Sequence, residues 1–338
     1  MRFGRMPNLH FGVFDCEASV KEMLFTLAPI GINEFAEALS AEYGHRKDTV
    51  MANWLQCISE YYHQGVYSVD YEVMPDEQMT ALKAHLLDDF YYLSEVKKIY
   101  QRNVPNADLS LLTTFNLKRM GFLVGTSYVI QNHPTAEAYF ESLLLTKDII
   151  DVAPISKRYT GLTTYSVYLS GIKRERKIIE FEPYQYINVH RLNKLGIEMS
   201  ALCRYCDEVW SFLTDDTYFS IQSIRAAGFE AELDSLGFGD LFYASLLKED
   251  GRFSWQRAGN AVIFSPIKRN FSVHDFLVAL IKQAESIDID EFVELLNGTY
   301  GAAIDRSSVL QGIKGSDIYY DKIMEKLYAN YDIYFEEI

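Results

Sequence analysis

Apolar and polar positions follow the same order near the two ends of the chain. The segment Ile30–Gly44 reads IGINEFAEALSAEYG and the segment Ile287–Gly301 reads IDIDEFVELLNGTYG, with eight of the fifteen positions identical. In the first segment Phe35, Leu39 and Tyr43 recur every four residues, which places them on one face of a helix. Such an internal match indicates that the chain is built by repeating a small helical unit.

Each copy predicts a helix, a turn that contains glycine, and a second capped helix. In the first copy Asn33 is the expected N-cap and Gly44 the expected end of the first helix. Asp48 or Thr49 is then expected to cap the second helix. This order of elements is typical of a helix-turn-helix.

The C-terminal copy predicts the same arrangement and a further helix. Asp290 and Asp305 are the expected caps of its two helices, Gly301 is the expected end of the first, and a third helix is expected from about Asp317. In a DNA-binding helix-turn-helix, the second helix reads base edges with short polar or basic side chains. The C-terminal copy offers Arg306, Ser307, Ser308, Gln311 and Lys314, and the N-terminal copy offers Arg46, Lys47, Asn53 and Gln56.

The net charge of the chain argues against wide contact with nucleic acid. The formal charge is −15, and residues 287–338 carry eleven acids against four bases. Phosphate contacts need clustered lysine and arginine, whereas this reading helix is surrounded by negative charge. The alternative is that the helix-turn-helix units serve in packing or protein docking.

A second pattern recurs in the middle of the chain. The motif Leu-x-x-(Leu/Met)-Gly-(Phe/Ile) occurs at Leu117–Phe122, Leu192–Ile197 and Leu233–Phe238, and each copy predicts a helix that ends at its glycine. Three helices are expected around the first copy, followed by a hairpin. Their ranges are Leu82–Tyr92, Ser94–Tyr100 and Leu109–Met120, with the hairpin at Leu123–Ile130. Three helices followed by a small hairpin form a winged helix.

The segment Phe238–Ser265 predicts a helix at Leu241–Leu247 and a hairpin that turns at residues 258–260. This segment resembles the end of the HARE-HTH winged-helix family. That family is similar to the N-terminal domain of the RNA polymerase delta subunit and to modules attached to restriction endonucleases and chromatin proteins. The resemblance lies in Phe242–Leu247, Arg252-Phe253, Arg257, Gly259 and Val262–Phe264, within about residues 220–265. It implies a module that binds DNA or the transcription machinery without catalysis.

One window of the chain is clearly basic. Residues 151–177 contain six bases and two acids, and Thr163–Leu169 and Lys177–Glu182 are expected to be strands joined by a turn. Lys173, Arg174, Arg176 and Lys177 lie in or beside that turn. One interpretation is a positively charged hairpin that contacts phosphate. The other is a solvated turn whose charges pair with acidic surface elsewhere.

The sequence offers little catalytic or metal-binding chemistry. Cys203 and Cys206 form a C-x-x-C motif with His190 upstream, but a tetrahedral zinc site needs four ligands and no second pair exists. The cysteines lie in an expected helix, Met199–Phe212, and are expected to pack as small apolar groups. P-loop, G-x-G-x-x-G, G-x-S-x-G and H-E-x-x-H motifs are absent. We therefore expect no enzyme activity, metal, cofactor or small-molecule substrate.

Composition indicates a globular protein of the cytoplasm. Four cysteines in 338 residues imply no disulfide framework. No segment approaches the run of about 18 apolar residues that spans a membrane. The N-terminal residues MRFGRMPNLHFG lack the apolar segment of a signal peptide. We expect no contact with a membrane.

The predicted fold is mainly α with small β-hairpins (α+β), organised as tandem helix-turn-helix and winged-helix modules. The expected domains are a helix-turn-helix module at 1–77, a winged helix at 78–150, a basic β-containing connector at 151–190, a winged helix at 191–267 and a helix-turn-helix module at 268–338. The predicted function is that of a non-enzymatic DNA-binding or transcription-associated regulator. The alternative is an acidic scaffold that binds proteins beside an RNA polymerase or a nuclease subunit.

Overall fold

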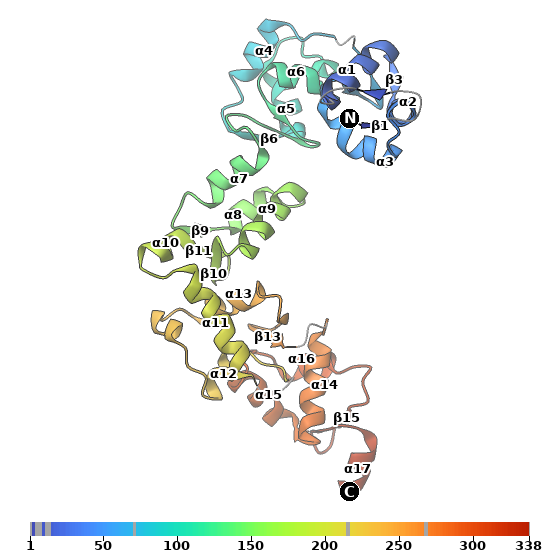
Figure 1. The fold of residues 1–338 in the computed structure, drawn as a ribbon. Helices are drawn as coiled ribbons and strands as arrows, with labels where there is room; N and C mark the ends of the chain where they lie inside the picture. The colour runs from blue at the N-terminus through green and yellow to red at the C-terminus, as the bar shows by residue number, and fades with distance from the viewer. Residues whose placement is uncertain are drawn as a thin grey trace. The chain divides into compact units, whose positions relative to one another are not determined.

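Short helices and small antiparallel sheets make up the protein. The computed structural model describes residues 2–3, 9–10, 15–69, 72–213, 217–266 and 270–337. The chain forms two compact units, Met1–Phe140 and Glu141–Ile338 (Figure 1). Its sheets contain two or three strands each, so the predicted α+β class is confirmed. Among the described helices, none combines the length and the apolar character needed to cross a membrane.

One order of elements recurs five times in the part of the chain that the structure describes. Each set contains a helix, a strand, two helices and a hairpin, and its opening strand pairs with the last strand of the hairpin. In the fourth set the opening strand is reduced to the bridge between Phe219 and Phe264. We call these sets repeats 1 to 5; they span Cys16–Tyr67, Asp76–Ile130, Ala136–Asn188, Met199–Ser265 and Val273–Tyr328.

Repeats 1 and 2 belong to the first unit. Repeat 1 contains α1 (Cys16–Leu27), β3 (Ile30–Gly31), α2 (Ile32–Tyr43), α3 (Lys47–Thr49), two further helical turns (Val50–Trp54 and Leu55–Tyr61), β4 (Tyr62–His63) and β5 (Val66–Tyr67). Repeat 2 contains α4 (Asp76–Lys83), β6 (Phe90–Tyr92), α5 (Leu93–Asn103), a 3-10 turn (Leu109–Leu111), α6 (Thr114–Arg119), β7 (Leu123–Val124) and β8 (Tyr128–Ile130). Before them, β1 (Arg2–Phe3) pairs with β2 (Leu9–His10).

Repeats 4 and 5 lie in the second unit, as does repeat 3 apart from the start of its first helix. Repeat 3 contains α7 (Ala136–Leu144), β9 (Ile149–Asp151), α8 (Ala153–Arg158), α9 (Thr163–Arg174), β10 (Ile178–Glu182) and β11 (Gln185–Asn188), and α10 (Val189–Lys194) follows. Repeat 4 contains α11 (Met199–Phe212), α12 (Ile221–Ala226), a 3-10 turn (Glu232–Leu236), α13 (Asp240–Lys248), β12 (Ser254–Ala258) and β13 (Ala261–Ser265). Repeat 5 contains α14 (Val273–Ala284), β14 (Ser286–Asp288), α15 (Ile289–Gly298), α16 (Arg306–Gly312), β15 (Tyr319–Asp321) and β16 (Lys326–Tyr328), and α17 (Tyr331–Glu337) follows.

The positions shared by the two duplicated segments are core positions. Phe35 and Leu39 of α2 are fully buried, as are their counterparts Phe292 and Leu296 of α15. Each pair packs in the core of its own repeat. The helical face predicted from their spacing is therefore confirmed, and the identity between the two segments reflects packing.

Gly44 ends α2 as expected, whereas α15 ends at Gly298 with Thr299 as its C-cap, before the expected Gly301, and two N-caps also differ from the prediction. Gly44 follows α2 in the left-handed conformation, with φ of 72°. Asn33 is not the cap, because α2 begins at Ile32 directly after strand β3. In α15 the cap is Asp288, whose carboxylate accepts from the amides of Asp290 and Glu291. Both helices begin where a short strand ends, a boundary that the sequence pattern did not reveal.

The predicted N-cap of the second helix is wrong in repeat 1 and confirmed in repeat 5. In repeat 1, α3 begins at Lys47, so Asp48 and Thr49 lie inside the helix and do not cap it. In repeat 5 the prediction is confirmed, since the carboxylate of Asp305 accepts from the amide of Ser308 at 2.8 Å.

The predicted strand Thr163–Leu169 is wrong, because these residues form the first part of α9. Tyr165, Leu169 and Ile172 recur at helical spacing, and Tyr165 and Ile172 are buried. This burial outweighs the β-branched and aromatic composition, which measures fit to a pleated surface rather than an intrinsic backbone preference. Lys173 and Arg174 consequently lie in the last turn of a helix, and Arg176 and Lys177 follow that helix instead of a strand.

The helix predicted from Asp317 is also wrong, because this part of the chain forms the hairpin of β15 and β16. The carboxylate of Asp321 accepts from the amides of Ile323 at 2.7 Å and Met324 at 3.1 Å. Glu325 then adopts a positive φ of 55°. Aspartate favours such turns because its side chain replaces a backbone acceptor.

In repeat 2 the predicted helix Leu82–Tyr92 is also wrong, because its last three residues form a strand. Helix α4 ends at Lys83, and Phe90–Tyr92 pairs with β8 as a strand. The expected hairpin after α6 is present, since β7 pairs with β8. The hairpin expected at the end of repeat 4 is present as well, where β12 pairs with β13 on both sides of residues 259–260.

Candidate interaction sites

Helix α16 and the turn after it contain the residues predicted to read base edges in the C-terminal copy, but Arg306 faces the hairpin of its own repeat. The Nη2 atom of Arg306 donates to Glu325 Oε1 and to the Tyr320 hydroxyl, both at 2.7 Å. Asp290 of α15 lies 4.0 Å from Nη1 of the same guanidinium. The three partners hold Arg306 against the protein, and no local pattern in the sequence indicated these contacts.

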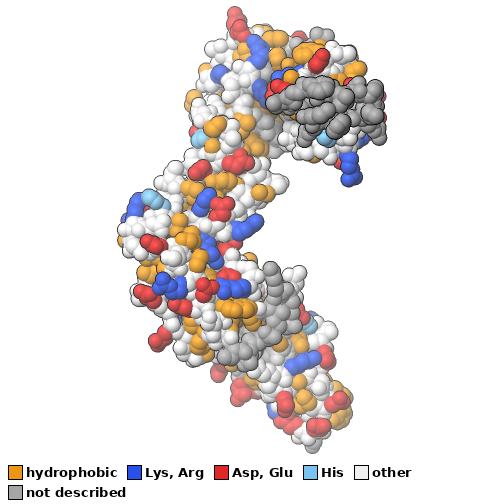
Figure 2. Space-filling view, viewed as in Figure 1, with side chains coloured by type: hydrophobic (Ala, Val, Ile, Leu, Met, Phe, Trp, Pro, Cys, Tyr) orange, Lys and Arg blue, Asp and Glu red, His pale blue; other side chains and the backbone are white. Residues whose placement is uncertain are grey.

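The other predicted residues of α16 and the turn after it lie on the surface. Ser307, Ser308, Gln311 and Lys314 are exposed. Helix α15 beside them carries the exposed acids Asp290, Glu291 and Glu294. Figure 2 shows acidic and apolar side chains close together in the C-terminal part of the molecule. The exposed face of repeat 5 is thus polar and acidic. Within α16 and the turn after it, Lys314 is a basic exception.

The predicted basic turn does not form one positive surface. Lys173 lies inward, with its Nζ atom 4.6 Å from the centre of the Tyr186 ring. Arg176 also lies inward, in contact with repeat 4. Arg174 and Lys177 are exposed, and Lys177 pairs with Glu175 at 2.7 Å. Two of the four cations are therefore available to a large partner such as a nucleic acid.

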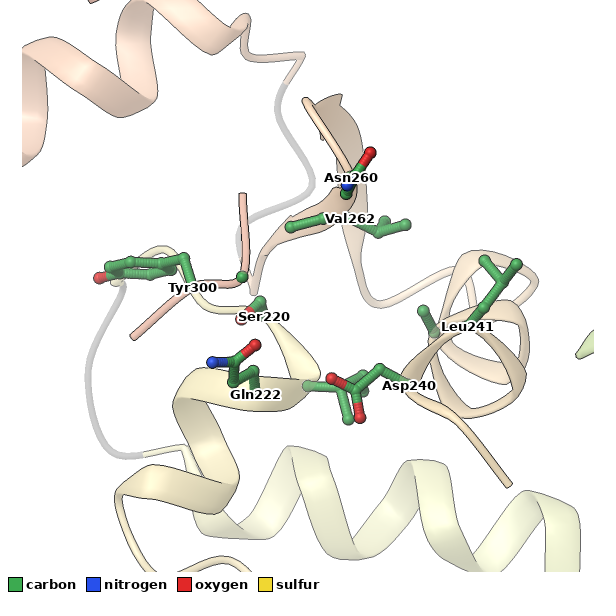
Figure 3. A pocket seen from close by; sticks show the side chains of 11 residues that line it. Ser220, Gln222, Asp240, Leu241, Asn260, Val262 and Tyr300 are labelled. Atoms are coloured by element: carbon green, nitrogen blue, oxygen red, sulfur yellow. The ribbon is translucent and has the colours of Figure 1, made fainter. Parts of the chain in front are cut away.

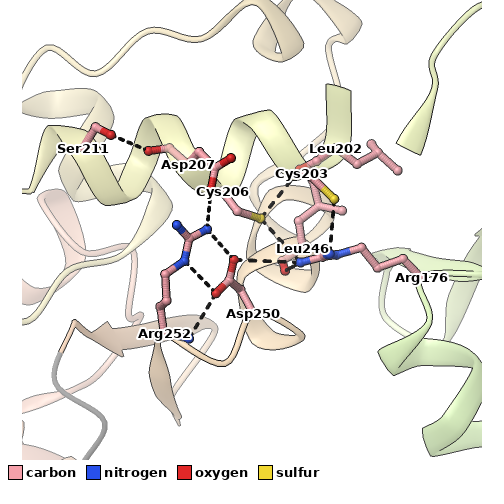
Figure 4. A network of polar contacts seen from close by, with 9 residues as sticks. All are labelled: Arg176, Leu202, Cys203, Cys206, Asp207, Ser211, Leu246, Asp250 and Arg252. Atoms are coloured by element: carbon pink, nitrogen blue, oxygen red, sulfur yellow. Dashed lines mark hydrogen bonds and ion pairs between the residues drawn. The ribbon is translucent and has the colours of Figure 1, made fainter. Parts of the chain in front are cut away.

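Arg176 joins repeat 3 to repeat 4 through the two cysteines of the C-x-x-C motif (Figure 4). Its Nη1 atom donates to Cys203 Sγ at 3.5 Å, and its Nη2 atom donates to Cys206 Sγ at 3.8 Å. The same Nη2 atom donates to the carbonyl of Leu246 at 3.5 Å and lies 4.0 Å from Asp250. Burial raises the pKa of Cys206 to about 12, which keeps this thiol protonated at neutral pH.

Asp250 is the anionic centre of this network. Arg252 donates to its two carboxylate oxygens at 2.9 and 2.7 Å, and also contacts Asp207 at 2.8 Å. The hydrogen bonds from Arg252 hold the pKa of Asp250 below its ordinary value. Within the described residues, no three histidine, cysteine or acidic side chains come close enough to hold a metal ion. The network is a joint between two repeats.

A second joint connects repeat 4 to repeat 5 around a cavity of about 90 Å³ (Figure 3). Gln222 of α12 donates to the carbonyl of Gly298 at 2.6 Å, and the amide of Asn260 donates to the carbonyl of Ala302 at 2.8 Å. Ser220, Asp240 and Tyr300 also line the cavity, as Figure 3 shows. Because these bonds fix one repeat against the next, the role of the cavity walls is structural.

Helix α13, which directly precedes the hairpin of repeat 4, is enclosed by protein. In α13, Phe242, Tyr243, Ala244, Leu246 and Leu247 are buried. Residues 241–248 include no exposed side chain, and the helix packs against β10 of repeat 3. This helix cannot enter a DNA groove while the second unit keeps this structure.

Comparison with known proteins gives no further guide to function. No model of a protein family matches this chain, and no curated protein matches it in sequence.

Proposed function

We propose that the chain is a non-enzymatic scaffold of tandem winged-helix modules that docks a basic protein partner. The observation that carries this proposal is the fivefold recurrence of helix, strand, two helices and hairpin, with the opening strand beside the last strand. That is the order of elements of a winged helix. Winged-helix modules bind either nucleic acid or protein, and the charge of the exposed faces favours protein here.

Three features weigh against DNA reading as the main function. Helix α13 is enclosed, Arg306 is held by Glu325, and Arg176 is held between repeats 3 and 4. The chain also carries a net charge of −15. Phosphate binding releases counterions in proportion to the number of free lysine and arginine contacts, and few such contacts remain on these surfaces.

Repeat 5 and α17 carry the surface that best fits a protein partner. At the tip of the β15–β16 hairpin Ile323 is 92% exposed and Met324 is 60% exposed. Tyr331 and Phe335 of α17 are 51% and 62% exposed. Large apolar side chains among acids match a partner with apolar anchors and a basic rim. The resemblance of repeat 4 to HARE-HTH modules suggests that this partner belongs to the transcription or nuclease machinery.

The test is co-purification of the full chain with partners from its own host at about 0.05 M and about 0.5 M salt. A basic partner should bind at the lower salt concentration and dissociate at the higher one. The double substitution Ile323→Ser and Met324→Ser should abolish its capture. Leu195→Ser, which removes an exposed leucine at the end of α10, is the matched control. A chain that remains alone, or a partner lost equally in both variants, would contradict the proposal.

Direct DNA contact by α16 is a second candidate, favoured by the exposure of Ser307, Ser308, Gln311 and Lys314. A mobility-shift assay at two salt concentrations tests it. Binding at low salt should weaken when Gln311 and Lys314 are both replaced by alanine. It should also weaken when Arg174 and Lys177 are both replaced by alanine. Absence of any shift at low salt would exclude this function.

A further inference from the structure

A cavity of about 230 Å³ lies between repeats 3 and 4, within the second unit. Its wall is formed by the end of α9, strands β10 and β11, helix α13 and strand β12. The wall carries two aromatic side chains, Tyr186 and Trp255, and five charged ones, which are Lys173, Arg176, Glu180, Lys248 and Glu249. Residues from two repeats thus bring three cations to one hollow.

The two lysines are poorly compensated by carboxylates. Lys173 Nζ lies 4.6 Å from the centre of the Tyr186 ring, and Lys248 Nζ lies 5.1 Å from the centre of the Trp255 ring. Lys248 also lies 3.8 Å from Glu180, a distance too long for a strong hydrogen bond. Burial lowers the pKa of both lysines. A buried ammonium group that faces a ring has lost water without gaining an equivalent partner.

The same wall contains two buried polar atoms that have no hydrogen-bond partner among the described residues. They are Arg176 Nε, a donor, and Ser245 Oγ, which can donate or accept. Unsatisfied buried polar atoms are uncommon in folded proteins, and a bound water or ion often explains them. Both residues line the cavity together with Lys173 and Lys248, although the two atoms themselves are buried behind its surface.

The acids of the wall do not cancel these cations. Glu180 is the nearer partner of Lys248. Burial raises the pKa of Glu249 above its ordinary value. Asp250 lies outside the wall, where it is engaged by Arg252. The wall therefore carries three cations, Lys173, Arg176 and Lys248, against two carboxylates, Glu180 and Glu249.

We propose that this cavity binds a phosphate-type anion through Lys173 and Lys248, with Arg176 and Ser245 in the supporting wall. Its volume lies below the roughly 300–1,000 Å³ of sites for drug-sized ligands, which favours a small ion or a phosphoryl group. Lysine ammonium groups are ordinary donors to phosphate oxygens. Tyr186 and Trp255 add flat apolar walls beside the cations.

The proposed site assigns a different role to two residues of the basic window, residues 151–177. Lys173 and Arg176 carry the charge that suggested phosphate contact, yet both are directed inward. A duplex backbone cannot follow them into a cavity of this size. A small anion can, and it would link the two repeats whose residues surround it.

The test is isothermal titration calorimetry of the full chain with inorganic phosphate, followed in parallel by tryptophan fluorescence, to which Trp255 contributes together with Trp54 and Trp210. We expect saturable binding with a change in emission. Lys173→Met and Lys248→Met should each weaken it about tenfold, as expected for losing one charge-assisted hydrogen bond. Lys157→Met, an exposed lysine of α8 in the same unit, removes the same charge and should leave the affinity unchanged.

A second titration with phenyl phosphate identifies the source of the phosphoryl group. Tighter binding than that of inorganic phosphate indicates a phosphomonoester whose flat group lies on Trp255, and equal affinity indicates free phosphate. If the wild-type chain shows no saturable binding of either compound, the proposal is overturned, whatever the folding state of the variants. Equal affinity in the wild type and all three variants would overturn it as well.

Discussion

Arg306 at the start of α16 donates to Glu325 of the neighbouring hairpin at 2.7 Å. This contact pairs the basic residue of a potential reading helix with an acid that lies 19 positions later in the chain. The surface of repeat 5 is therefore acidic both because acids outnumber bases there and because Arg306 is paired with an acid. The state of this pair decides how much positive charge α16 presents.

Glu325→Gln should release Arg306 and raise any affinity of the chain for DNA. The substitution removes a carboxylate acceptor and one negative charge next to α16. Mobility shift at low salt measures the effect, and Glu336→Gln on the exposed side of α17 is the charge-matched control. An equal gain in both variants would show that net charge, and not the release of Arg306, is responsible.

Arg176→Ala should lower the free energy of unfolding by about 1.5–3 kcal/mol, the range for hydrogen bonds that involve charged groups. The variant loses the donors to Cys203, Cys206 and Leu246 that join repeats 3 and 4. Urea unfolding measures the loss. Arg174→Ala removes an exposed arginine two positions earlier and should change stability little. Similar losses in both variants would contradict the role of Arg176 as a joint.

Gly259→Ala should destabilise the joint between repeats 4 and 5 by more than about 1 kcal/mol. Gly259 has φ of +56°, and a Cβ atom there would lie 1.9 Å from the carbonyl oxygen of Ala302. Gly228→Ala is the matched control, because Gly228 also has a positive φ, +95°, but its Cβ would meet nothing within 4 Å. The urea midpoint of the first variant should fall further than that of the second. Equal midpoints would show that backbone strain alone matters.

Stability should fall in acid partly through Asp250. Hydrogen bonds from Arg252 keep its pKa in the folded protein below the ordinary value of 3.8. Its contribution is therefore complete above the pKa of the unfolded chain and is lost as the pH falls through the lower pKa of the folded state. Urea unfolding between about pH 7 and pH 3 should show a smaller loss in Asp250→Asn than in the wild type. Parallel curves for the two proteins would contradict this assignment.

The sequence by itself determined the local units of this protein. The spacing of Phe35 and Leu39, the glycine after α2, and the hairpin of β12 and β13 all follow from interactions among residues close in the chain. The exposure of Ser307, Ser308, Gln311 and Lys314 also agrees with their helical positions. Local periodicity and turn chemistry suffice for such features because few distant residues enter them.

Only the tertiary structure decided which of these units present a usable surface. Arg176 reaches the carbonyl of Leu246, 70 positions away, and α13 is enclosed by β10 of the preceding repeat. The end of the chain folds as a hairpin where a helix was predicted, because Asp321 closes a turn and β16 pairs with β14. A basic residue is available to a partner only if no distant acid, carbonyl or ring holds it. That condition depends on contacts between repeats, which no local pattern in the sequence contains.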